Sequence, residues 1–425
     1  MVMYETTHLS NGLTVISNYM PHTRSVSINI YVGIGSRYED NVHAGISHFV
    51  EHMLFKGSTD RPSSVAISGA IEDLGGLFNG GTDRQTTNFW CKVAYSHFHQ
   101  ALDVLIDMVR YPLIGEAEVE KERGVIQEEL NMTNDSPNDR VDVLTDEMLW
   151  PHHPMGRDIG GTRESVDGIT HEMLRRWYSS YYGASNVVIS VAGNIPHDEV
   201  LAAVVPLVSD WPRGSRPVFT PVQDNDALTS SQILVEHRRT QQAHVCISLR
   251  GLPTRHPDRY AFDMMSSILG GGMSSRLFVE VREKQGLAYD VSSGTSHFPD
   301  TGSLVVYFGV EPKKVSLAIR TVLEELRKIQ SGVQDPELAR AKEFAKGHLL
   351  LRMEDTRAVS AWAGAQEILY REVITVDEVV DRVNHVTSAD VGNSARAHLQ
   401  DSAMNLAVVG PFRSDLQFRR LLPRQ

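Results

Sequence analysis

The segment His48-Phe49-Val50-Glu51-His52 places two imidazoles and a carboxylate at a spacing that can bind a metal ion. On a helix, residues four apart lie on the same face, so His48 and His52 can hold one ion together. Glu51 lies on the same side and can hold a metal-bound water without being a ligand. Catalytic zinc takes three protein ligands and keeps one position open. The pattern therefore predicts a zinc site that needs a third ligand from elsewhere in the chain.

The local sequence favours a helix around this motif. Apolar residues recur at helical spacing between Ala44 and Lys56, and Gly57 follows as a stop signal. The alternative is an amphipathic helix whose histidines bind no metal, because the chain contains 18 His and short motifs also match by chance.

A second acidic helix can supply the third ligand. The stretch from Glu116 to Asn134 contains Glu122 and Glu129, which are seven residues apart and share one helix face. Glu128 points about 100° away from Glu129 on a helix of 3.6 residues per turn, so it is excluded. The alternative for such a run of charges is a solvated helix face.

Composition limits the function classes. A chain of 425 residues can form two or three domains. The formal net charge of −12 argues against general nucleic-acid binding, which needs a basic surface. No apolar run reaches the length of a membrane span, and the first residues do not have the pattern of a signal peptide or an organelle presequence.

The cysteines bear on the compartment. Cys91 and Cys246 each lie in an alternating, strand-like run, and they are far apart in the sequence. This predicts two buried free thiols in a reducing compartment. We therefore expect a cytoplasmic protein without membrane or nucleic-acid partners.

The chain repeats itself. Three pairs of similar segments are each 217 residues apart: those that begin at Ile169 and Val386, those that end at Gly193 and Gly410, and those that begin at Ala101 and Ala318. One constant offset indicates a duplicated domain. The same shift moves the zinc motif onto Met265, Ile268 and Leu269, so we expect one active site per chain.

The repeat predicts a domain division and a fold class. Residues 211–230 contain three prolines and suit an extended linker between domains at 1–210 and 231–425. Ser25 to Val32 alternates apolar and polar residues, which predicts a half-buried strand of an antiparallel sheet. Asn11-Gly12 is a hairpin signal. Long helices are expected at about 95–110, 116–134 and 138–149, and this grouping of elements favours an α+β fold.

Four segments carry a family resemblance: GISHFVEHMLFKGS, LGGLFNGGTDRQTTNF, EKERGVIQEELNM and SSRLFVEVREKQGLAY. In this order, and over essentially the whole chain, they resemble the pitrilysin and mitochondrial processing peptidase family of zinc peptidases, in its short two-domain bacterial type. The resemblance implies two homologous domains, each an antiparallel sheet packed with helices, that form half of a clamshell. It also implies a zinc endopeptidase that hydrolyses short or unfolded peptides.

The resemblance assigns roles to the acidic residues. Zinc is implied to be held by His48, His52 and Glu129, with Glu51 as the general base. Glu122 begins the family's pattern of two Glu at seven-residue spacing, and it is grouped with Glu51 as a catalytic residue, close to the metal but not bound to it.

Two further segments are implied to contact substrate. Asn79 matches a family Asn on an edge strand beside which a peptide adds as another strand, although Gly80 replaces the family's Ala and Gln85 stands where relatives often have Glu. Without the resemblance, Gly80-Gly81 indicates a hairpin turn or bulge. Arg282 and Tyr289 match a family pair that binds substrate opposite the zinc; the alternative is an exposed helix Arg and a core-packed strand Tyr.

The short chain also suggests an assembly. Long family members carry four such domains, whereas this chain has two, so we expect a homodimer with two-fold symmetry. The rival class is a non-catalytic scaffold or regulatory subunit of the same fold, which the intact metal motif disfavours. The run Gly270-Gly271-Gly272 is a flexible turn and not a phosphate loop, because no Gly-Lys-Ser/Thr follows it.

Overall fold

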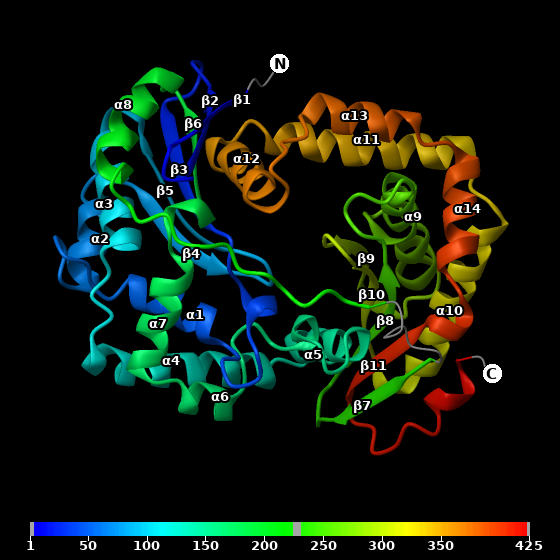
Figure 1. Cartoon of the computed structure of the whole chain (residues 1–425). Coiled ribbons are helices and arrows are strands. Elements are labelled where there is room, and N and C mark those ends of the chain that lie inside the picture. The colour runs from blue at the N-terminus through cyan, green and yellow to red at the C-terminus, as the bar shows by residue number, and fades with distance from the viewer. Residues whose placement is uncertain (1–3, 224–230, 423–425) are drawn as a thin grey trace. The chain divides into compact units, whose positions relative to one another are not determined.

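The computed structural model describes residues 4–223 and 231–422, which divide into two compact units (Figure 1). Unit 1 contains the chain up to Leu130, Arg157–Thr220 and Leu349–Asp377, and unit 2 contains Asn131–Gly156, Pro221–His348 and the chain from Glu378 onward. No helix in these described ranges combines the length and apolar character that crossing a bilayer requires.

Unit 1 is built on a six-stranded sheet. In spatial order its strands are β1 (Tyr4–His8), β2 (Thr14–Tyr19), β6 (Val187–Gly193), β3 (Ser25–Val32), β5 (Thr87–Ala94) and β4 (Leu77–Thr82). All neighbours are antiparallel except β2 and β6, which are parallel. The sequence predicted an antiparallel sheet, and the pair of β2 and β6 departs from it. These two strands run parallel because the chain enters β6 through a long helical crossover and not through a hairpin. The predicted hairpin at Asn11-Gly12 joins β1 and β2, with Gly12 at a φ of 92°.

Helices cover one face of this sheet. The alternating residues Val26, Ile28 and Ile30 of β3 join a core with residues from the helices of unit 1. These helices are α1 (Ile46–Leu54), α2 (Ser64–Glu72), α3 (Phe98–Arg110), α4 (Glu116–Asp135), α6 (Arg163–Gly168), α7 (His171–Tyr181) and α8 (His197–Val208). The helices predicted at about 95–110 and 116–134 are confirmed as α3 and α4.

A helix from late in the sequence covers the other face. In α12 (Thr356–Tyr370), Ala363 and Ile368 pack against apolar residues of the sheet. Ser360 of α12 accepts a hydrogen bond from Asn29 Nδ2 at 2.6 Å, and its carbonyl accepts one from Ser190 Oγ at 2.7 Å. The expectation that β3 is half-buried is therefore wrong, because α12 satisfies its polar face and removes that face from water.

Unit 2 repeats this architecture around five strands. In spatial order they are β7 (Ile233–His237), β11 (Asn405–Gly410), β8 (Ala243–Gly251), β10 (Gly302–Val310) and β9 (Ala288–His297). Only β7 and β11 are parallel among these described strands. Its helices include α9 (Arg259–Gly270), α10 (Val315–Lys328), α11 (Asp335–Arg352), α13 (Val376–His385) and α14 (Ser388–His398). The end of α11, from Leu349, and the start of α13, up to Asp377, belong to unit 1. The helix predicted at 138–149 is α5 (Pro137–Leu149), which packs its apolar face on β8 and β11.

The duplicated segments fold alike. The offset of 217 residues relates α3 to α10, α7 to α14 and β6 to β11, and the five shared strands follow the same spatial order in each sheet. It also relates α5 to α12, and each of these two helices belongs to the unit opposite to its own repeat (Figure 1). The predicted domains 1–210 and 231–425 thus correspond to the two copies of the sequence repeat. The compact units differ from these domains because each unit contains one helix of the other copy, α12 in unit 1 and α5 in unit 2. The chain passes between units at Thr220–Pro221, within the predicted linker, whose residues 224–230 lie outside the described part.

The thiols are placed as predicted. Cys91 lies on β5 and Cys246 on β8, and both are free and buried. Burial raises the pKa of the Cys91 thiol to about 12, so this thiol stays protonated and unreactive near neutral pH.

Candidate active site

The motif helix is α1, and it brings the two histidines together. His48 and His52 are one turn apart, and their Nε2 atoms are 3.0 Å from each other. Both side chains are largely buried, with 20% and 15% of their surfaces exposed. The predicted helix from Ala44 to Lys56 is confirmed, with regular α-helix between Ile46 and Leu54.

Glu129 of α4 completes a three-atom cluster. Its Oε2 is 3.6 Å from His48 Nε2 and 3.4 Å from His52 Nε2. Ligands of tetrahedral zinc at its usual bond lengths are about 3.3 Å apart, so the three donor atoms already form one face of such a tetrahedron. Within the described residues, this is the one group of His, Cys, Asp and Glu side chains whose ligand atoms converge closely enough to hold a metal ion. Two imidazole nitrogens and a carboxylate oxygen are also donors that zinc prefers.

Glu122 contacts His52 from the side away from this cluster. Its Oε1 accepts a hydrogen bond from His52 Nδ1 at 2.8 Å, and its Oε2 forms an ion pair with Lys56 Nζ at 2.7 Å. The Glu122 side chain is 6% exposed, and although burial raises its pKa, the hydrogen bonds from His52 and Lys56 lower it overall. Glu122 therefore orients a ligand and does not face the donor atoms, as expected for a residue near the metal but not bound to it.

Glu51 projects from α1 toward the edge strand β4. Its Oε2 accepts a hydrogen bond from Thr82 Oγ1 at 3.0 Å. The residue is buried, and burial raises the pKa of its carboxyl above the ordinary value, although His52 and the Thr82 hydrogen bond act in the opposite direction. A carboxylate with a raised pKa has the proton affinity that a general base needs near neutral pH.

The two histidines differ in proton affinity in the metal-free protein. Burial, together with the smaller effect of the neighbouring charge on His52, lowers the pKa of His48 to about 4. Burial also lowers the pKa of His52, but the hydrogen bond to Glu122 and the nearby carboxylates raise it overall. His48 is therefore neutral and able to bind metal, whereas His52 must give up a more tightly held proton.

The segment matched to the family's substrate strand is an edge strand. β4 ends the order of the unit 1 sheet and pairs only with β5 among the described strands. The alternative interpretation of Gly80-Gly81 as a hairpin turn is wrong, because both residues lie inside β4. Asn79 is exposed, and its Oδ1 accepts a hydrogen bond from the Gly80 N–H at 2.8 Å.

Gly80 lies directly against Glu51. A Cβ atom at this position would lie 2.9 Å from Glu51 Oε1 and 2.8 Å from Cε2 of Phe55. Real Cβ atoms do not approach other atoms this closely, so the glycine leaves room that Glu51 and Phe55 occupy. The replacement of the family's Ala by Gly80 therefore has a local packing reason in this chain.

The Arg/Tyr pair lies in unit 2. Arg282 is in a helical segment, Phe278–Lys284, and Tyr289 is at the start of β9. Arg282 Nη1 donates to the Tyr289 carbonyl at 2.8 Å, and its guanidinium lies 4.5 Å from the centre of the Tyr289 ring. Tyr289 is 76% exposed, so it does not pack on the core as the alternative interpretation expected. The Arg282 guanidinium and the Tyr289 ring therefore lie together at the surface of unit 2.

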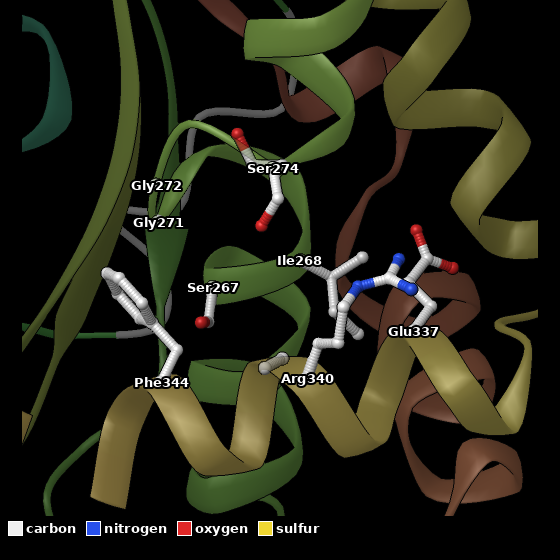
Figure 2. Close-up of a pocket in the computed structure, with 10 residues that line it drawn as sticks. Ser267, Ile268, Gly271, Gly272, Ser274, Glu337, Arg340 and Phe344 are labelled. Carbon is white, nitrogen blue, oxygen red and sulfur yellow. The ribbon is translucent and has the colours of Figure 1, made fainter. Parts of the chain in front are cut away.

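The glycine run of unit 2 borders a small pocket between α9 and α11 (Figure 2). Its lining includes Ser267, Gly272, Arg340 and Phe344, and a Cβ at Gly272 would lie 3.1 Å from the Phe344 ring. The cavity volume is about 30 Å³, which accommodates one or two water molecules. None of the predicted site residues lines this pocket, so we assign it no role in substrate binding.

Two polar partners of the site were not identified from the sequence. Thr82 fixes Glu51, and Lys56 pairs with Glu122. Lys56 lies four residues after His52, so the helical period could have placed it on the same face. Thr82 has no comparable signal, because only the packing of α1 beside β4 brings it to Glu51.

Comparison with protein-family models assigns both halves of the chain. Residues 14–163 match the model described as insulinase (peptidase family M16), and residues 168–344 match the peptidase M16 inactive domain. The inactive-domain match covers α9, which is equivalent to α1 in the sequence repeat.

Curated relatives cover nearly the whole chain. An uncharacterized zinc protease of Streptomyces coelicolor is 35% identical over 98% of this chain and 91% of its own length. One from Bacillus subtilis is 35% identical over 94% of this chain and 97% of its own length, and one from Mycobacterium tuberculosis is 33% identical over 99% and 95%.

Solved structures share the fold. A protease from Helicobacter pylori superposes with a TM-score of 0.89 at 20% identity, covering 96% of this chain and all of that one. A peptidase M16 inactive domain from Pseudomonas fluorescens gives a TM-score of 0.88 at 20% identity, covering 97% and 99%. These two likenesses establish the two-domain α/β architecture.

Proposed function

Because the chain belongs to peptidase family M16, the insulinase family, we propose that it is a zinc-dependent endopeptidase that hydrolyses short or unfolded peptides. The observation that carries the proposal is the convergence of His48 Nε2, His52 Nε2 and Glu129 Oε2 at the edge lengths of a zinc tetrahedron. The relatives are named zinc proteases, which supports the same metal and the same reaction class.

In the proposed mechanism these three residues hold the ion, and Glu51 moves the proton. Bound zinc supplies Lewis acidity that polarises the scissile carbonyl and lowers the pKa of a water. Thr82 occupies Glu51 Oε2, so Oε1 is the atom that takes the proton of the attacking water and passes it to the leaving amine. Burial keeps the proton affinity of this carboxylate high enough for both transfers.

The peptide is proposed to add along the free edge of β4. Main-chain hydrogen bonds along an edge strand bind an extended peptide with little regard to its side chains. The exposed Asn79 lies on this edge, beside Gly80 and the base. Arg282 and Tyr289 are proposed to bind the substrate and the developing oxyanion, because a guanidinium and a phenol are both suitable donors.

We further propose a homodimer in which the Arg282/Tyr289 surface serves the partner's zinc site. Subunit exchange tests this arrangement: Glu51→Gln chains and chains with both Arg282→Ala and Tyr289→Phe should each be inactive alone. Mixed dimers should regain one working site. Absence of recovery after demonstrated exchange would reject sharing between subunits. The two free buried thiols support a reducing compartment, and we propose a cytoplasmic location.

The direct test combines metal analysis with a peptide assay. The purified protein should contain about one zinc per chain and should cleave a quenched fluorogenic peptide until a chelator removes the metal. Glu51→Gln should retain zinc and lose at least about a hundredfold in kcat. Glu128→Gln is the matched control, since Glu128 is exposed on α4 beside Glu129. Stoichiometric zinc without chelator-sensitive cleavage of any peptide in a mixed library would favour the scaffold alternative.

A further inference from the structure

The active-site helix α1 starts without a cap of its own. Its N-cap residue is Gly45, at a φ of 89°, which has no side chain to accept hydrogen bonds from the first turn. The first N–H groups of a helix have no partners within it and must find acceptors elsewhere. His48 lies within this first turn, so whatever satisfies these groups also determines where the first ligand stands.

The missing acceptor is Glu39, six residues before the cap position. Its Oε2 accepts a hydrogen bond from the Gly45 N–H at 2.8 Å, and its Oε1 accepts one from the Ser47 N–H at 2.9 Å. The residue is 2% exposed. One buried carboxylate thus bridges two donors at the positive end of the helix, where negative charge is favoured, while the Ile46 N–H between them donates to the His43 carbonyl.

A second segment holds the same turn from the other side. Arg157 Nη2 donates to the Glu39 carbonyl at 2.5 Å, and the chain then runs through Gly160 and Gly161. A Cβ at Gly45 would lie 2.4 Å from the Gly160 carbonyl, and one at Gly161 would lie 2.4 Å from the carbonyl of Ala44. The start of α1 is therefore fixed by close backbone contact as well as by Glu39.

The duplicated unit starts the equivalent helix differently. There α9 begins at Arg259, four residues before the position equivalent to Ile46. The N–H of Phe262, which is equivalent to Gly45, therefore donates within the helix, to the Asp258 carbonyl at 2.9 Å, and the position equivalent to Glu39 is His256. Burial raises the pKa of Glu39 to about 7, although the N–H hydrogen bonds and Arg157 oppose this rise, so ionised Glu39 lowers the stability of the folded state. A costly buried carboxylate is present in the half that carries the metal motif and absent from the half that lacks it.

We propose that Glu39 is a positioning residue for the reaction: its carboxylate holds the first turn of α1 so that His48, Glu51 and His52 stand in register with Glu129. The inference rests on the proposed peptidase function. Glu39 contacts no ligand atom and lies on no surface where a peptide binds, so its effect should appear in kcat and not in KM. A misplacement of catalytic groups by about 1 Å can lower the rate by about a hundredfold.

The test is the Glu39→Gln variant. Glutamine has one acceptor oxygen, and its NH₂ group would face the second N–H, so one of the two hydrogen bonds is lost. We expect kcat to fall by about ten- to a hundredfold while KM changes by less than about threefold. We also expect faster hydrogen exchange at the amides of Gly45 and Ser47, with a melting temperature equal to or above that of the wild type. Glu39→Asp keeps the charge and should recover part of the lost kcat.

The matched control is Glu367→Gln. Glu367 is another buried carboxylate of unit 1, on α12, where its Oε1 accepts from Arg371 Nη1 at 3.1 Å. This variant should keep the wild-type kcat even if its stability changes.

Two results would overturn the role of Glu39. One is a wild-type kcat in Glu39→Gln, and the other is a loss of activity matched by an equal loss of folded protein. If the wild type itself binds no zinc and cleaves no peptide, the proposed function fails. The role of Glu39 in holding the first turn of α1 is then judged by amide exchange alone, and unchanged exchange at Gly45 and Ser47 in Glu39→Gln would reject it.

Discussion

Replacing Glu122 with glutamine tests how α4 supports the metal ligand His52. Glu122 accepts from His52 Nδ1 at 2.8 Å and pairs with Lys56 Nζ at 2.7 Å, and its side chain is 6% exposed. Glutamine has nearly the same shape but no charge, and its NH₂ group must face one of these two donors. The variant therefore loses one of two buried contacts and the negative charge that makes His52 a stronger ligand.

The expected magnitude follows from these contacts. Loss of a partner that orients a zinc ligand lowers metal affinity by about ten- to a hundredfold, or about 1.4–2.7 kcal/mol. The loss should depend on pH. Although burial lowers the pKa of His52, the hydrogen bond to Glu122 and nearby carboxylates raise it overall, so zinc must displace a proton held to higher pH than usual. Glu122→Gln lowers the proton affinity of His52, so the proton competes less with zinc in the variant than in the wild type. The loss of zinc affinity relative to the wild type should therefore be largest at high pH and should shrink as pH falls.

Competition with a zinc chelator, followed at one pH below and one above the pKa of His52, measures this difference. Glu120→Gln is the matched control, because Glu120 lies on the same helix and carries the same charge, and its side chain is 67% exposed and pairs with Arg123. The reasoning is refuted if Glu122→Gln and Glu120→Gln bind zinc equally well at high pH. A deficit that grows as pH falls would equally refute the account of His52.

Three further outcomes are expected. Gly80→Ala should lower kcat about tenfold with full zinc content, because its Cβ would lie 2.9 Å from Glu51 Oε1; steady-state kinetics with metal analysis checks this. Because burial raises the pKa of Glu39 from 4.5 to about 7, the free energy of unfolding should fall as pH rises through this range, and Glu39→Gln should remove that part of the slope in urea titrations at several pH values. Gly364→Ala should destabilise the protein by about 1–3 kcal/mol, since its Cβ would lie 2.7 Å from the Tyr31 ring; a lower urea midpoint with unchanged zinc affinity checks this.

The part of the site that is local in sequence could be predicted. The spacing of His48, Glu51 and His52 is one helical turn, and that of Glu122 and Glu129 is two. Helical geometry alone therefore decides which of these side chains share a face. Packing of α1 on α4 then brings the two faces together, which the sequence indicated through the family resemblance and not through periodicity.

The remaining features depend on contacts between distant segments. The polar residues Asn29 and Ser190 face α12, which lies more than 150 positions further along the chain, so alternation in β3 resembled that of a solvated sheet face. Glu39 was missed for a related reason, because a helix cap is sought at the residue before the first turn. Here that residue is Gly45, and the acceptor comes from a loop six residues earlier.

The duplicated unit shows how the helix equivalent to α1 packs when it carries no metal ligands. In α9 the positions equivalent to His48, Glu51 and His52 are Met265, Ile268 and Leu269, and all three are buried in the core of unit 2. The same helix in the same architecture is therefore well packed with apolar side chains alone. Buried polar and ionisable groups are more costly than apolar residues of similar volume unless each finds a partner.

Unit 1 keeps such groups at the equivalent positions and surrounds them with partners that the second repeat lacks. Glu122 and Glu129 correspond to Ala339 and Lys346, so neither the orienting carboxylate nor the third ligand has a counterpart on α11. The fold thus tolerates the complete loss of this cluster, so folding alone does not account for its presence in unit 1. The proposed zinc chemistry accounts for it, and each partner that satisfies a member of the cluster also fixes the geometry on which that proposed chemistry depends.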